Sequence, residues 1–297
     1  MYFINGSYVA KEDATLSVLD LSVLRGFGVF DYLRTYRKKP FHLWDHLLRL
    51  RYSAEQLGLQ LPYSLEEIEQ IIERVLELTN LPESSLKIIL TGGVSPDQFT
   101  PQKPSLIIFA YPLSAYPTHF YTNGIKVITT PLSRCLPTSK TIQYIPAIVA
   151  LKKGREQNAQ EALYLSPSGK ILEATTSNFF GFKNGVLHTC CSDEVLAGIT
   201  REALLKLLSN YFPISHEAIS CQEIPLLEEA FITASNKEIM PVNQIDDYLI
   251  NWGVVGPKTQ KIMAVFRAYT EQDIWPMLNI ERYKLLDTES PTLLNSF

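Results

Sequence analysis

Three short segments in the second half of the chain constrain its fold more than any other feature of the sequence. They read SKT at 139–141, EATTSNFF at 173–180 and LAGITR at 196–201. A lysine that is partly shielded from water can act as an amine nucleophile. A glutamate at a strand end can supply a fixed negative charge, and a glycine before a helix leaves backbone N–H groups free to bind an anion. These properties point to one site that combines an amine, an acid and an anion-binding helix start.

The order and spacing of these segments resemble those of the fold-type IV enzymes that depend on pyridoxal 5′-phosphate (PLP). Glu173 follows Lys140 by 33 positions, and Gly198 follows Glu173 by 25. The resembling enzymes are branched-chain aminotransferases, D-amino acid aminotransferases and aminodeoxychorismate lyase. The resemblance extends from LRGFGVFD at 24–31 to about Phe266. It implies that Lys140 is the catalytic lysine, which forms a Schiff base with PLP.

The same resemblance implies the other contacts to PLP. Glu173 keeps the pyridine nitrogen protonated, which the cofactor needs to act as an electron sink. Backbone N–H groups at the helix start and in the polar turn TASN at 233–236 bind the phosphate, and Arg49 reaches it across the domains. The predicted cofactor-binding residues are Arg49, Lys140, Glu173, Ser177, Asn178, Ile199, Thr200, Ala234 and Ser235.

Hydrophobic periodicity predicts an α+β fold with two domains. The expected parts are a small N-terminal α/β domain over 1–115, a linker over 116–122 and a larger cofactor-binding domain over 123–297. The resemblance implies a β-barrel-like sheet core in the larger domain. Strands are expected over 1–9, 29–36, 86–91, 105–111, 125–130, 162–165, 171–173, 179–182, 186–189 and 230–232, and helices over 44–57, 64–79, 145–157, 200–208 and 257–269. The segment after Thr270 has no pattern that predicts its structure.

Bulk composition excludes several classes of partner. The 297-residue chain has a net charge of −4, which gives no reason to expect nucleic acid or an anionic membrane. It has neither a readable signal peptide nor the roughly 20 uninterrupted apolar residues of a membrane helix. The four cysteines form neither a metal-binding spacing nor a disulfide framework, and His42 and His46 suit packing and capping better than metal binding. We expect a cytoplasmic protein without a metal site.

Substrate recognition is where the chain departs from its relatives. D-amino acid aminotransferases share an Arg-x-His pair in the loop over 92–100, where this chain has Asp97, Gln98 and Phe99. Branched-chain enzymes carry an arginine in the strand over 86–93, which here reads LKIILTGG. Arg25 and Lys237 remain as candidate carboxylate anchors, unless Arg25 pairs with Asp20 or Asp31 and Lys237 pairs with Glu238. The predicted substrate-binding residues are Arg25, Phe30, Tyr32, Asn236 and Lys237.

These features predict a PLP-dependent transaminase that exchanges an amino group between an amino acid and a 2-oxo acid by a ping-pong mechanism. D-amino acids such as D-alanine and D-glutamate are favoured, with Arg25 as the replacement anchor. The alternatives are a branched-chain L-amino acid aminotransferase, an aminodeoxychorismate lyase and a catalytically silent binding module. Because active sites of this family are completed across a two-fold interface, we also expect a homodimer.

Overall fold

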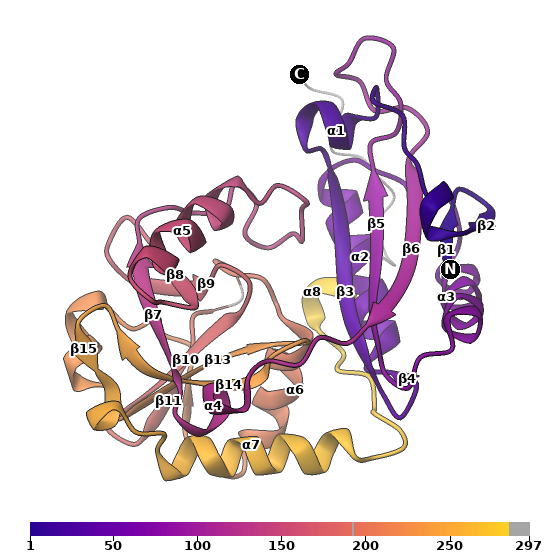
Figure 1. The fold of residues 1–297 in the computed structure, drawn as a ribbon. Helices are drawn as coiled ribbons and strands as arrows, with labels where there is room; N and C mark the ends of the chain where they lie inside the picture. Colours follow the sequence, from indigo (N-terminus) through magenta and orange to yellow (C-terminus); the bar gives the residue numbers. More distant parts are fainter. Residues whose placement is uncertain (192, 285–297) are drawn as a thin grey trace.

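The computed structural model describes residues 1–191 and 193–284, which form two separate β-sheets (Figure 1). The first sheet has six strands in the order β2-β1-β6-β5-β3-β4, and every pair is antiparallel. Tyr32 of β3 lies opposite Lys87 of β5. The strands are β1 (Tyr2–Ile4), β2 (Ser7–Val9), β3 (Gly28–Tyr36), β4 (Lys39–Pro40), β5 (Ser84–Thr91) and β6 (Ser105–Pro112).

Two amphipathic helices, α2 (Leu43–Gln56) and α3 (Leu65–Thr79), pack on this sheet through a single buried hydrophobic cluster. Helix α3 begins at a capping box, in which the Ser64 hydroxyl accepts from the Glu67 N–H at 3.1 Å. The Glu67 carboxylate in turn accepts from the Ser64 N–H at 2.7 Å. A short helix, α1 (Leu21–Arg25), precedes β3 and was not expected from the sequence.

The second sheet closes into a six-stranded barrel. Its closed path runs β9-β10-β13-β14-β7-β8, and the pairing of β10 with β9 completes the ring. Closure removes the exposed strand edges that an open sheet would present. The barrel strands are β7 (Ile125–Thr130), β8 (Glu161–Leu165), β9 (Ile171–Ala174), β10 (Asn178–Lys183), β13 (Glu229–Ala234) and β14 (Glu238–Ile245), and the flanking strands are β11 (Val186–His188), β12 (Ile214–Ser215) and β15 (Tyr248–Leu249).

Further helices surround this barrel, namely α4 (Thr118–Thr122), α5 (Ile145–Glu156), α6 (Ile199–Leu208) and α7 (Pro257–Thr270). Short 3₁₀ turns lie over 221–226 and 250–253 in the same part of the chain, and another over 11–13 follows β2 of the first sheet. Helix α4 lies within the predicted linker, between the last strand of the first sheet and the first strand of the barrel. No helix among residues 1–191 and 193–284 is long and apolar enough to cross a membrane.

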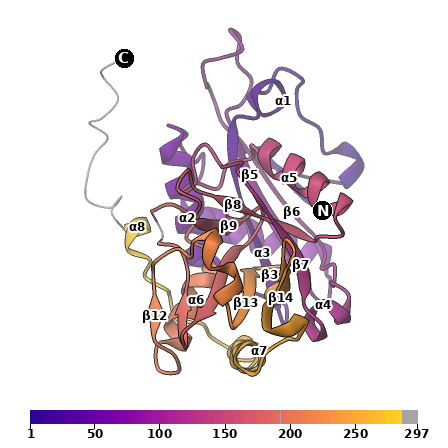
Figure 2. The same cartoon turned by 90° about the vertical axis from the view of Figure 1, so that its left-hand side faces the viewer.

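The α+β class and the barrel-like core expected from the resemblance are confirmed, whereas β14 and α8, like α1, were not anticipated. Strand β14 lies in the middle of the barrel, yet its sequence EIMPVNQI contains a proline and no clear alternation. The segment after Thr270 has a defined path, because it returns along the molecule and places α8 (Glu281–Lys284) beside α2 (Figures 1 and 2). The Leu278 N–H donates to buried Asp45 at 2.9 Å.

We expect Asp45→Ala to destabilise the protein, because it leaves the buried Leu278 N–H without its acceptor and also removes one of the two partners of the His42 ring. The loss should be about 1–3 kcal/mol, measured as a lower urea midpoint. Asp273→Ala is the matched control, since Asp273 pairs with Arg37 and Lys39 at the exposed surface of the same segment. It should change stability by less than about 0.5 kcal/mol. Equal effects of both changes would contradict a buried anchor.

Candidate active site

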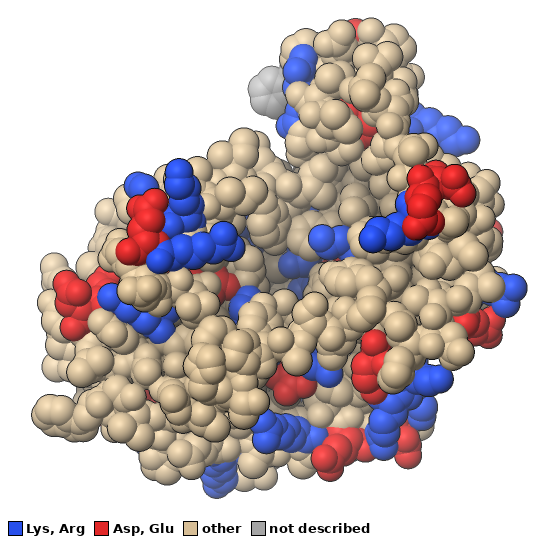
Figure 3. Space-filling view, in the orientation of Figure 1, with Lys and Arg blue, Asp and Glu red and all other residues tan. Residues whose placement is uncertain are grey.

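A cavity of about 500 Å³ lies between the first sheet and the barrel. The face shown in Figure 3 is hollowed between the two parts of the molecule, and basic side chains lie in the hollow. Strands β3, β5 and β6 form one wall, while β8, β9, β10, the start of α6 and the turn between β13 and β14 form the other. This volume is ordinary for a small-molecule site.

Two hydrogen bonds of its backbone fix Lys140 in the lining of this cavity. Its N–H donates to the Ser53 hydroxyl at 3.0 Å, and its carbonyl accepts from the Phe30 N–H at 2.9 Å. The amine lies 4.7 Å from the centroid of the Phe30 ring. Burial, reinforced by the nearby Arg49 guanidinium, lowers the pKa of Lys140 to about 7. Much of the amine is therefore neutral, and so nucleophilic, near neutral pH.

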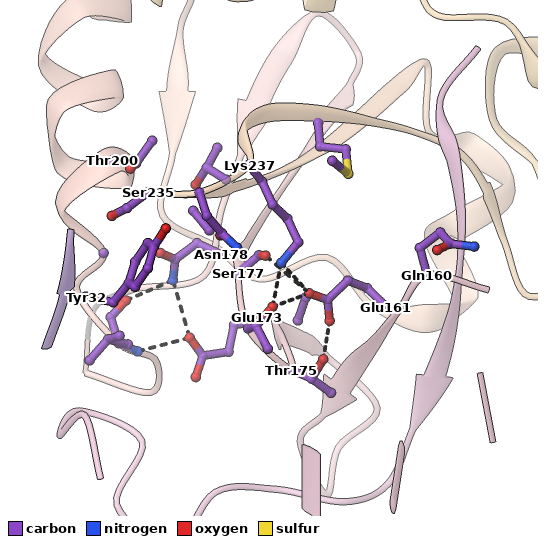
Figure 4. A pocket seen from close by; sticks show the side chains of 18 of the residues that line it. Tyr32, Gln160, Glu161, Glu173, Thr175, Ser177, Asn178, Thr200, Ser235 and Lys237 are labelled. Atoms are coloured by element: carbon purple, nitrogen blue, oxygen red, sulfur yellow. Dashed lines mark hydrogen bonds and ion pairs between the residues drawn. The ribbon is translucent and has the colours of Figure 1, made fainter. Parts of the chain in front are cut away.

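Glu173 is buried, and both of its carboxylate oxygens are fixed. One accepts from Arg134 at 2.9 Å, and the other accepts from Asn178 Nδ2 at 3.3 Å and from the Leu196 N–H at 3.2 Å (Figure 4). Burial raises the pKa of Glu173, an effect that Arg134 opposes. Four lone-pair sites on a carboxylate leave room for one more donor, such as a protonated ring nitrogen.

Arg134 is a site residue that the sequence did not reveal. Its guanidinium contacts Glu173, the Pro137 carbonyl at 3.0 Å and the Ser139 carbonyl. It thereby ties the acid to the loop that carries Lys140. The position of an arginine six residues before the lysine was the only available signal, and it did not show where the side chain points.

The start of α6 has the features of an anion-binding site. Gly198 is the N-cap residue and provides no side-chain cap, so the first N–H groups of the helix face the cavity. The hydroxyls of Thr200 and Thr233 are buried and have no hydrogen-bond partner among the described residues. A Cβ at position 198 would lie 2.0 Å from Asn178 Oδ1, so only glycine fits. Unsatisfied donors around a cavity suit the phosphate of PLP.

Arg49 reaches this helix start from α2. It is buried and forms a two-pronged ion pair with Asp31, with its Nε and Nη2 atoms at 2.9 and 2.8 Å from the carboxylate oxygens. Its Nη1 atom donates to the Ala197 carbonyl at 3.3 Å, just before Gly198. Burial would raise the pKa of Asp31, but Arg49 and His46 together lower it well below its usual range. The arginine is therefore fixed beside the expected phosphate position.

Lys237 occupies the cavity wall but does not pair with Glu238. Its amine lies 2.9 Å from Glu161 Oε1 and donates to the Thr176 hydroxyl at 2.6 Å (Figure 4). Both charged groups are buried. Burial would raise the pKa of Glu161, but Lys237 and the neighbouring threonines lower it overall, so the pair stays ionised and mutually neutral. Glu238 instead pairs with Arg34 at 2.8 Å.

The other predicted residues fall into two groups. Phe30, Tyr32, Ser177, Asn178, Ile199, Ala234, Ser235 and Asn236 all line the cavity. Arg25 does not: it is exposed on α1, 4.5 Å from the centroid of the exposed Phe99 ring, and it pairs with neither Asp20 nor Asp31. In a single copy of the chain, Arg25 is therefore separate from the predicted site.

One group outside the cavity lining has the composition of a metal site. Cys190, Cys191 and Glu194 place one potential ligand atom each within 4.8 Å of one another. Burial raises the pKa of the Cys190 thiol, which favours the protonated form that binds metal poorly.

Comparisons with known proteins agree with this geometry. The chain matches the family described as amino-transferase class IV over residues 28–245. A Methanocaldococcus jannaschii protein, provisionally assigned as a branched-chain-amino-acid aminotransferase, is 31% identical over 89% of this chain and 94% of its own length. The D-alanine aminotransferase of Staphylococcus epidermidis is 29% identical over 91% of this chain and 97% of its own.

Solved structures give the same result for the fold. The branched-chain amino acid aminotransferase of Escherichia coli superposes with a TM-score of 0.87 and 26% identity, covering 93% of this chain and 97% of its own. Sequence, fold and the cavity built around Lys140 agree, and the chain belongs to the class IV aminotransferases, which use PLP.

Proposed function

We propose that this aminotransferase prefers D-amino acids and exchanges their amino group with 2-oxo acids by a ping-pong route. The observation that carries the proposal is the distribution of charge around the cavity. At the turn between β13 and β14, the charge of Lys237 is cancelled by Glu161. On the opposite wall, beside Phe30, the ammonium of Lys87 has no carboxylate partner among residues 1–191 and 193–284. A substrate carboxylate is therefore attracted to the Phe30 side.

The Phe30 side is the one on which the D-specific relatives bind the substrate carboxylate. Phe30 stands where those enzymes have a tyrosine hydroxyl, and their second anchoring group comes from the loop over 92–100. Strand β5 of this chain lacks the arginine that branched-chain enzymes carry there, which argues against the branched-chain L-amino acid alternative. Overall similarity does not separate the two specificities, because relatives of both kinds are 29–31% identical to this chain.

The cavity suggests a role for five of the predicted cofactor-binding residues and for Arg134. Lys140 would form the covalent link to PLP and then move a proton to and from the substrate Cα. Glu173 would hold the proton on the pyridine nitrogen, with Arg134 fixing its orientation. The N–H groups at Ile199 and Thr200 would bind the phosphate, with Arg49 supplying positive charge. PLP supplies the electron sink for this chemistry.

A second copy of the chain would give Arg25 a substrate-binding role. Arg25 and Phe99 are exposed and contact each other, away from their own cavity. Exposed apolar side chains accompany them on α1 and α5, namely Val23, Ile145, Ile148 and Val149. Such exposure is typical of an interface. We propose a homodimer in which Arg25 acts at the cavity of the partner, in the cytoplasm, where the four free thiols would stay reduced.

The proposed stereochemistry can be tested by single-turnover reactions of the PLP-loaded enzyme with D- and L-alanine and D- and L-glutamate. The change in cofactor absorbance reports amino-group transfer. The D enantiomers should react at least about tenfold faster at equal concentration, which corresponds to about 1.4 kcal/mol of discrimination. Faster reaction of L-alanine or L-glutamate than of the D enantiomers would overturn the proposal and favour the L-amino acid alternative.

Lys140→Ala should bind PLP without a covalent link and should lose turnover by several orders of magnitude. Borohydride reduction of the wild type, followed by peptide mapping, should label Lys140. A label on Lys87 or Lys237, which also line the cavity, would refute this assignment. Because only the neutral amine reacts, the rate of link formation in the cofactor-free protein should rise with pH and reach its half-maximum near pH 7. An ordinary lysine would give a midpoint near about 10.4.

The role of Arg25 in the partner's cavity predicts complementation. Arg25→Ala alone should lower kcat/KM about 10- to 150-fold while PLP loading is kept. A heterodimer of Arg25→Ala with Lys140→Ala, purified by two tags, would have one site with both residues intact and should show about half the wild-type rate. If the heterodimer is as inactive as the two single variants, Arg25 acts at the cavity of its own chain, which would contradict the proposal. A fully active monomer in light scattering would exclude the dimer itself.

A further inference from the structure

The basic side chains around the cavity differ in their partners. The six that line it are Arg49, Lys87, Arg134, Lys140, Arg155 and Lys237. Three of them are each paired with a carboxylate of this chain, and Lys140 is reserved for the cofactor. Arg155 is exposed on α5, so water screens its charge. Lys87 is left as the half-buried cation that no carboxylate neutralises within the described part of the chain.

Lys87 lies in aromatic surroundings. It occupies β5, opposite Tyr32 on β3 and Phe109 on β6. Its amine is 5.2 Å from the centroid of the Phe30 ring. Burial lowers the pKa of Lys87, and no neighbouring carboxylate offsets this effect. A partly desolvated ammonium without a counter-ion is unfavourable, and an anionic ligand would relieve that cost.

The positions of Lys87 and Lys140 point to the ligand. Both residues line the same cavity, and both amines lie near the ring of Phe30, 4.7 Å from its centroid for Lys140 and 5.2 Å for Lys87. In an α-amino acid, the nitrogen and the carboxylate are bonded to the same carbon, Cα. A substrate nitrogen at the position of the Lys140 amine therefore places the substrate carboxylate close by. We propose that Lys87 binds the α-carboxylate of the amino acid substrate, an inference that rests on the proposed orientation of the substrate with its carboxylate on the Phe30 side.

The opposite wall is a weaker site for that carboxylate. At the turn, the carboxylate would meet the Lys237–Glu161 pair, whose negative member is held by Thr175 and Thr176 as well. Capturing Lys237 would require breaking this buried pair and leaving Glu161 uncompensated, which is costly. Lys87 needs no such rearrangement. Tyr32 completes its neighbourhood, with its hydroxyl fixed to the Ser85 hydroxyl at 2.8 Å.

The test uses Lys87→Met, which keeps the length of the side chain and removes its charge, in the PLP-loaded enzyme. Alanine and glutamate are compared in the enantiomer that the wild type accepts. Because every amino acid carries the α-carboxylate, kcat/KM should fall by about 10- to 150-fold for both substrates. A loss confined to glutamate would mean that Lys87 binds the side-chain carboxylate, and it would overturn the proposal. An unchanged kcat/KM for both substrates would overturn it as well.

Two controls separate binding from general effects. Arg155→Met removes another cation of the lining, one with no carboxylate partner among residues 1–191 and 193–284, and it should have a smaller effect than Lys87→Met. An equal or larger loss in Arg155→Met would show nonspecific attraction and contradict the proposal. Lys87→Arg keeps the charge and should recover part of the lost kcat/KM. Lys87→Gln repeats the measurement if the methionine variant does not fold.

A binding measurement provides a readout independent of turnover. Propionate carries a carboxylate but no amine, and propionamide is its neutral counterpart. By calorimetry on the PLP-loaded protein, Lys87→Met should raise the Kd of propionate at least about tenfold and leave that of propionamide unchanged. Equal propionate binding by both proteins would refute the inference. The preference of the wild type for D or L substrates is measured separately, so failure of the proposed stereochemistry is distinguishable from failure of the Lys87 assignment.

Discussion

The ion pair between Asp31 and Arg49 connects the two halves of the molecule. Asp31 belongs to β3 of the first sheet, Arg49 belongs to α2, and the guanidinium extends to the Ala197 carbonyl at the start of α6. His46 adds a second contact to Asp31 at 2.6 Å. Because Asp31 occupies two of the guanidinium nitrogens, the side chain cannot turn away from the barrel. The phosphate site therefore depends on a carboxylate that lies outside the cavity lining.

Charge pairing organises the rest of the cavity in the same way. Glu173 is matched by Arg134 and Glu161 by Lys237, so each acid in the cavity lining has its own cation. Burial alone would favour the neutral acids, and the paired cations oppose that tendency. Lys140 forms no ion pair with any described residue, and the loss of solvent lowers its pKa instead. The same principle leaves Lys87 as a cation available to a ligand.

The sequence could predict the parts of the site that depend on local chemistry, but not those that depend on long-range contacts. Lys140, Glu173 and Gly198 stand in motifs whose spacing is visible, and the capping box of α3 uses residues three apart. The partners of Lys237 and Glu173 lie 76 and 39 positions away, at Glu161 and Arg134, and no periodicity connects them. Strand β14 was missed because both its faces are largely covered, which removes the alternation that marks a half-buried strand.

The carbonyl of Ala197 has a consequence for the order in which the protein can be completed. It accepts from Arg49, in the first sixth of the chain, and from the Tyr283 hydroxyl at 3.0 Å, near the far end of the described residues. During synthesis, this junction cannot close until residue 283 has left the ribosome. The nascent chain thus passes through a stage in which the barrel is translated but the entrance to its phosphate site is unfinished. The final setting of the phosphate site therefore cannot form before residue 283 is available.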